Sequence, residues 1–77
     1  MSLTVVVTFN SIPPDDEIAL MGDWLTPYIA NGNTSEFPLP MIGNKLYRVW
    51  DTVENAEAFI VKVLEIYSTA SSAVISE

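Results

Sequence analysis

The order of the sequence patterns predicts an α+β domain with the split βαβ topology of the ferredoxin-like fold. Two alternating segments that contain β-branched and aromatic residues, 3–9 and 45–50, are typical of strands. Each is followed by apolar residues at helical spacing, in segments 14–31 and 53–67. We therefore expect an antiparallel sheet with both helices on one face and the other face uncovered, in a single domain spanning residues 1–77.

The first strand, residues 3–9, has two different sides. Leu3, Val5, Val7 and Phe9 alternate on one side, and Thr4, Val6 and Thr8 lie on the other. We expect the fully apolar side to face the core. Pro13 and Pro14 follow closely, and proline cannot donate to a sheet ladder, so the strand ends before them.

The first helix is expected to begin at Pro14, since the first turn of a helix does not use the missing N–H. The next three residues, Asp15-Asp16-Glu17, place carboxylates near the positive end of the helix dipole. Pro27 predicts either a kink or a break, in which Thr26 would cap a short second helix. The helical pattern ends at Asn31-Gly32.

Residues 31–44 are rich in Asn, Gly, Ser and Pro and are expected to form mostly loop. Within them, residues 36–42 favour a short strand, which two prolines confine to an edge of the sheet. The pair Gly43-Asn44 predicts a turn into the strand at residues 45–50.

The second helix is expected to be capped by Thr52, with Glu54 in the first turn. Its predicted apolar stripe consists of Val53, Ala56, Ile60, Val63, Leu64 and Tyr67, with Phe59 and Ile66 beside it. A polar break at residues 68–72 follows. Residues 73–75 then form either a last short strand or a frayed tail.

The charge of the chain is strongly acidic, with ten Asp and Glu, three Lys and Arg, and a net charge of −7. Nucleic acids and anionic membranes are bound by cationic groups, so we expect neither as a partner. The acidity favours encounter with a basic protein surface, although it also serves simply to keep a small apolar protein soluble. No signal peptide or spanning segment is expected, which predicts a cytoplasmic protein.

Two residue types that often act in catalysis, histidine and cysteine, do not occur in the sequence. The run Asp15-Asp16-Glu17 offers oxygen ligands, but consecutive residues fan around a helix, and the helix dipole explains them. Glu54 and Glu57 are expected on a solvent face, where the pKa is not raised as acid–base catalysis requires. We therefore expect no metal, no cofactor and no catalytic residue.

The strand at residues 45–50 contains the candidate binding surface. Leu46, Arg48 and Trp50 share one side of it, and Tyr47 and Val49 share the other. If Tyr47 and Val49 face the helices, then an interface patch of Leu46, Arg48, Trp50, Val6 and Thr8 lies on the open face. Its aromatic and arginine content is typical of interface hot spots. In the opposite orientation Leu46 and Trp50 are buried, and Arg48 extends its charge outward to solvent.

The run Tyr47-Arg48-Val49-Trp50-Asp51-Thr52, with Glu54 and Ala56-Glu57-Ala58-Phe59-Ile60, is similar to small proteins of unassigned role encoded by tailed bacteriophages. The resemblance implies a phage accessory protein in a host cytoplasm and transfers no functional residue. Segments 5–10 and 17–24 resemble the opening of a starch-binding domain. That family is an all-β sandwich of about a hundred residues, so the helical pattern at 53–67 argues against it.

Together these patterns predict a non-catalytic, acidic protein-interaction module, such as a phage accessory protein that binds or inhibits a host protein. A homodimer that packs two open sheet faces together is a variant of this hypothesis. The alternatives are a virion or assembly component and a cofactor-independent, dimeric ferredoxin-like enzyme. Such an enzyme would rely on Tyr28, Tyr47 and Tyr67 and would need a cavity of at least ~300 Å³.

Overall fold

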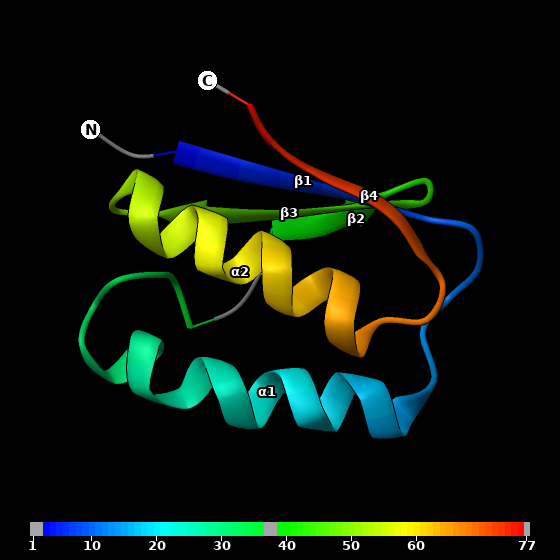
Figure 1. The fold of residues 1–77 in the computed structure, drawn as a ribbon, viewed down its shortest axis with the longest axis horizontal. Coiled ribbons are helices and arrows are strands. Elements are labelled where there is room, and N and C mark those ends of the chain that lie inside the picture. Colours follow the sequence, from blue (N-terminus) through cyan, green and yellow to red (C-terminus); the bar gives the residue numbers. More distant parts are fainter. Residues whose placement is uncertain (1–2, 37–38, 77) are drawn as a thin grey trace.

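The chain folds as an α+β domain with a ferredoxin-like arrangement, in a computed structural model that describes residues 3–36 and 39–76 (Figure 1). The elements are β1 Leu3–Phe9, α1 Asp15–Ala30, β2 Leu39–Ile42, β3 Lys45–Trp50, α2 Val53–Ile66 and β4 Ala70–Ser76. The strands form one antiparallel sheet in the order β2-β3-β1-β4. The predicted fold class is therefore confirmed.

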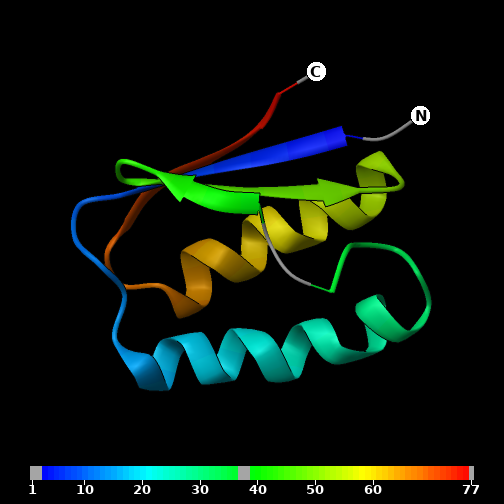
Figure 2. The ribbon, with the colours of Figure 1, turned by 180° about the vertical axis from the view of Figure 1, so that it is seen from behind.

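Both helices lie on the same side of the sheet, and the opposite side is left uncovered (Figures 1 and 2). The helix α2 packs directly on β1, β3 and β4, while α1 packs against α2. In both views α1 lies farther from the sheet than α2. The space between α1 and the sheet is therefore closed only by the side chains that extend into it.

The two central strands fix which side of the sheet is inside. Along β1 the side chains alternate between buried and half-buried, and Val5 and Val7 have no exposed area.

The last strand, β4, pairs with β1 on the edge that does not contact β3, from Thr4↔Ser76 to Phe9↔Ala70. Residues 73–75 thus belong to a strand that begins earlier than predicted, and the frayed tail is ruled out.

Aromatic rings join the two helices to the sheet. The ring of Trp50 lies 5.2 Å from that of Phe59 and 5.5 Å from that of Tyr28, measured between centroids. Trp24 stacks on Phe59 at 6.4 Å and contacts Tyr28 at 4.6 Å. Trp50 and Phe59 are fully buried, so this cluster is the centre of the core.

The helix α1 is continuous through Pro27, so the predicted break at Thr26 is wrong. The missing N–H of Pro27 leaves only the carbonyl of Asp23 without a helical donor, and Asp23 is exposed to water. The helix ends as predicted at Asn31-Gly32. Gly32 has φ +77°, and the N–H groups of Gly32 and Asn33 donate to the carbonyls of Ile29 and Tyr28, as in a Schellman motif.

The helix α2 is capped as predicted, since the Thr52 hydroxyl accepts the N–H of Asn55 at 3.2 Å. Its buried residues are Ala56, Phe59 and Val63. Val53 and Leu64, which were predicted to lie in the stripe, are exposed instead. The apolar residues of α2 cover a wider arc of the helix surface than the sheet and α1 can bury. The large ring of Phe59 occupies the middle of the buried arc, so the residues at its margins stay exposed.

Candidate functional site

The predicted interface patch is divided between the two faces of the sheet. In the register of β1 and β3, Trp50 lies opposite Leu3, Arg48 opposite Val5 and Leu46 opposite Val7. Residues opposite each other in a sheet point to the same side, and Val5 and Val7 are buried beneath the helices.

Leu46, Arg48 and Trp50 therefore face the helices, and their predicted exposure is wrong. Trp50 is 0% exposed and Arg48 is 4% exposed. The opposite orientation predicted the burial of Trp50 correctly, but it placed the charge of Arg48 in solvent. Val6 and Thr8 do lie on the open face, because they alternate with the buried positions of β1.

The open face of the sheet includes Ile42 of β2, which lies opposite Lys45 and is 70% exposed, and three residues from each of the other three strands. The latter are Thr4, Val6 and Thr8 of β1, Lys45, Tyr47 and Val49 of β3, and Ser72, Val74 and Ser76 of β4. Across its middle, Val6 lies between Tyr47 and Val74, and Val74 is 56% exposed. This row is apolar except for the phenol hydroxyl.

The acidic residues are segregated from this face, since none of the four strand sequences contains Asp or Glu. In the described part of the chain, the carboxylates belong to the helices and the loops, at positions 15, 16, 17, 23, 36, 51, 54, 57 and 65. Lys45 is the charged residue on the open face. The molecule is therefore polarised, with an acidic helical layer and a neutral to weakly basic sheet face.

Beneath the sheet, Arg48 holds the loop between α1 and β2 against β3. Its Nη1 donates to the Thr34 hydroxyl oxygen at 3.2 Å and to the Ser35 carbonyl oxygen at 2.8 Å. The Thr34 hydroxyl donates in turn to the carbonyl of Val49 at 2.6 Å. These bonds use both hydrogens of Nη1.

The other edge of the Arg48 guanidinium has no acceptor among the described residues. In the ranges 3–36 and 39–76, neither Nε nor Nη2 makes a hydrogen bond, and no carboxylate pairs with this arginine. Burial lowers the pKa of Arg48, and the group nevertheless stays charged at neutral pH because the ordinary pKa of arginine lies far above neutral. A buried cation without a counter-ion is costly, so this edge favours an anion.

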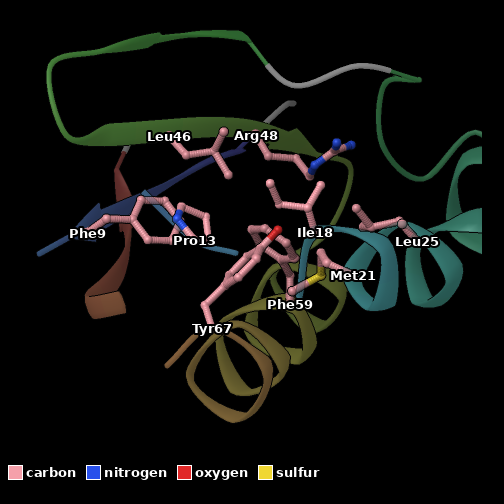
Figure 3. A pocket seen from close by; sticks show the side chains of 10 residues that line it. Phe9, Pro13, Ile18, Met21, Leu25, Leu46, Arg48, Phe59 and Tyr67 are labelled. Atoms are coloured by element: carbon pink, nitrogen blue, oxygen red, sulfur yellow. The ribbon is translucent and has the colours of Figure 1, made fainter. Parts of the chain in front are cut away.

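A cavity of about 230 Å³ lies between α1 and the sheet, and Figure 3 shows Arg48 among the residues that line it. The lining is formed by Phe9, Pro13, Ile18, Met21, Gly22, Leu25, Leu46, Arg48, Phe59 and Tyr67. Apart from Arg48 and Tyr67, every lining side chain is apolar. The larger distance of α1 from the sheet leaves this space open.

Tyr67 contributes the second polar group of the cavity. Its ring is 7% exposed and meets Phe9 edge to face at a centroid distance of 5.3 Å. Figure 3 shows its hydroxyl among the lining side chains, and this hydroxyl makes no hydrogen bond to any described residue. Burial raises the pKa of Tyr67, while the positive charge of Arg48 lowers it. At neutral pH the group is a phenol that can donate.

The sequence indicated some of these features and not others. Arg48 lies between Leu46 and Trp50 on one face of the strand. A charged residue between two large apolar residues on the same face indicates a buried charge that needs a hydrogen-bond acceptor. Gly22 in the middle of a helix is a comparable signal, because a helical glycine often marks open space or close approach. The sequence placed Tyr67 in the apolar stripe and, with Tyr28 and Tyr47, among the polar groups of a possible enzyme, but nothing in the pattern predicted that it lines a cavity with Arg48.

Comparison of the chain with protein-family models, with curated proteins and with solved structures finds no match in any of the three. Within the residues that the structure describes, no three of the His, Cys, Asp and Glu side chains gather into a group that could hold a metal ion. No helix in the same part of the chain is long and apolar enough to cross a membrane. The site must therefore be argued from its own geometry.

Proposed function

We propose that the chain is a non-catalytic protein-interaction module whose open sheet face docks against the same face of a second copy. The observation that carries the proposal is the absence of Asp and Glu from every strand of a chain with net charge −7. This open face exposes Val74 and the half-buried side chains of Val6, Tyr47 and Val49. Aromatic and aliphatic side chains without charge are the composition of an interface centre.

Charge repulsion favours this face over the helical layer for self-association. Two sheets that pack face to face lie about 10 Å apart, and the carboxylates lie on the far side of each sheet. That separation exceeds the Debye length of about 8 Å at physiological salt, so the two acidic layers are screened from each other. Contact through the helices would instead bring the carboxylates of both copies together.

The size of the face sets the expected affinity. Strands spaced about 4.8 Å apart, with about 3.3 Å per residue, give a four-stranded face of roughly 400 Å² in projection. Stable interfaces bury about 800 Å² per partner, so we expect a weak dimer with a micromolar dissociation constant. The acidic helical layer remains exposed in such a dimer and favours encounter with a basic protein.

Two further observations support a binding role over the alternatives. The cavity beneath α1, of about 230 Å³, is smaller than the ~300 Å³ or more of typical substrate pockets, and the larger hollow of about 360 Å³ beside Asn33 and Asp51 is more open to solvent. The chain also lacks histidine and cysteine. The resemblance of residues 47–52, 54 and 56–60 to phage proteins of unassigned role supplies no functional residue. A phage protein that docks on a host protein would be one instance of the proposed module, and a virion or assembly component would be another.

Two exposed valines on opposite faces provide the test. Val74 is 56% exposed on the open face, and Val61 is 65% exposed on α2. Sedimentation equilibrium from about 1 to 500 μM should show self-association of the wild type in the micromolar range. Val74→Glu should weaken it at least tenfold, because the change places two carboxylates in the apolar centre of the interface, and Val61→Glu should leave it unchanged.

Each other outcome counts against the proposal. A monomer mass at every concentration would show that the open face does not bind a second copy of the chain. Association weakened by Val61→Glu and not by Val74→Glu would place the interface on the helices. A circular dichroism spectrum of each variant checks that the fold is retained.

A further inference from the structure

We propose that the cavity between α1 and the sheet is a binding site for a small apolar monocarboxylate, whose carboxylate pairs with the Nε–Nη2 edge of Arg48. This site goes beyond the proposed docking function, because it lies on the opposite side of the sheet. It rests on the juxtaposition of an apolar cavity with a guanidinium edge and a tyrosine hydroxyl that have no hydrogen-bond partner among residues 3–36 and 39–76.

The geometry of the guanidinium specifies the head group. Nη1 is fixed by Thr34 and Ser35, so the fork itself is held in place before any ligand arrives. The N–H groups of Nε and Nη2 point in parallel from one edge, which matches the two oxygens of a carboxylate. The Tyr67 hydroxyl is positioned to donate a further hydrogen bond to an anionic ligand.

The cavity specifies the body of the ligand. A cavity of ~150 Å³ lined by aliphatic and aromatic residues holds a benzene molecule. The space here is about 230 Å³, which leaves room for a ring and a short carboxylate arm. Met21, Leu25, Leu46 and Phe59 offer such a ligand apolar contacts on all sides.

The site is also accessible to a ligand from solution. Ile18 and Gly22 line the cavity from α1 and are themselves exposed, so the cavity reaches the surface beside this helix. The nearest acidic element is the first turn of α1, where Glu17 contributes to the surroundings of Tyr67. Both carboxylate oxygens of Glu17 accept hydrogen bonds from Ser68, at 3.1 and 2.8 Å, and among the described residues Glu17 forms no ion pair with Arg48.

The test compares two ligands of the same shape. Phenylacetate carries the charge, and phenylacetamide replaces one carboxylate oxygen by an amide nitrogen. We expect phenylacetate to bind with a millimolar or lower dissociation constant in a titration followed by NMR, at least tenfold tighter than phenylacetamide. The side-chain Nε resonance of Arg48 should shift with phenylacetate, which a purely structural arginine would not show.

A matched pair of variants on α1 tests the cavity. No atom lies within 4 Å of a Cβ built on Gly22, so Gly22→Leu should extend into the cavity and weaken phenylacetate binding at least tenfold. Ala19→Leu adds a leucine to an exposed position of the same helix outside the cavity, and it should leave binding unchanged. Neither variant alters the open sheet face, so both should keep the oligomeric state of the wild type.

Several results would overturn the proposal. These are no binding of phenylacetate at millimolar concentration, equal affinity for the two ligands, an unmoved Arg48 Nε resonance, or undiminished binding to folded Gly22→Leu. Arg48→Lys keeps the charge and removes the fork, so it should reduce the preference for phenylacetate over phenylacetamide. Because Arg48 also holds the loop, that variant is interpreted only alongside Gly22→Leu.

Discussion

Arg48 and Thr34, which are 14 residues apart in the sequence, meet at 3.2 Å between Nη1 and Oγ1 beneath the sheet. Through this contact and a β-bridge between Thr34 and Trp50, the segment that follows α1 is held against a central strand. Asp51 N–H adds a backbone hydrogen bond to the Asn33 carbonyl at 3.1 Å, in the same segment. The position of the guanidinium, and with it the shape of the cavity, therefore depends on this segment.

Replacing Thr34 by valine should destabilise the fold. Valine has nearly the same shape, but it cannot donate to the Val49 carbonyl or accept from Arg48. Losing these two bonds at a part-buried site should cost about 1–3 kcal/mol of unfolding free energy, measured by urea denaturation. Thr34→Ser keeps the hydroxyl and should cost less. Equal losses for both variants would mean that the methyl group, and not the hydrogen bonds, matters here.

Trp50→Ala should be far more damaging than a change on the open face of the same strand. Trp50 is fully buried among Tyr28 and Phe59, so its removal should cost about 3–5 kcal/mol. A chain of 77 residues has a total stability of roughly 4–12 kcal/mol, so the variant is expected to be partly or wholly unfolded.

Tyr47→Ala is the matched comparison, since Tyr47 lies on β3 but faces the open side. It should lower the thermal midpoint much less than Trp50→Ala does. Similar midpoints for the two variants would contradict the assignment of the strand faces.

The stability of the protein in acid should depend on Asp51. Hydrogen bonds from Asn55 and Asn33, at 2.9 and 2.8 Å, lower the pKa of Asp51. The folded state thus favours the ionised carboxylate. Its stabilising contribution is present above the unfolded pKa of about 3.9 and is lost as the pH falls through the folded value.

Asp51→Asn removes this ionisation while keeping the size of the side chain. The difference in unfolding free energy between wild type and variant should be largest at neutral pH and should shrink below about pH 4. Urea denaturation from pH 2.5 to 7 measures it. Because Asp51 is fully exposed, the effect is small, and a difference that does not change with pH would argue against the two hydrogen bonds.

The choice of the buried face of β3 shows where the sequence stopped being informative. Both faces of residues 45–50 carry large apolar groups, Leu46 and Trp50 on one and Tyr47 and Val49 on the other. Alternation separates the two faces but does not say which one is inside. The pairing of Val5 with Arg48 decides it, and that pairing joins residues 43 positions apart.

The sequence by itself determined the order of the elements, the cap at Thr52, the turn at Gly43-Asn44 and the segregation of charge away from the strands. These depend on residues close together in the chain or on composition, so local chemistry specifies them. Only the tertiary structure decided that Arg48 is buried and unpaired beside Tyr67, and that α1 leaves a cavity there. Burial and cavities are properties of how elements pack, and the distance of α1 from the sheet is set by side chains from the whole chain.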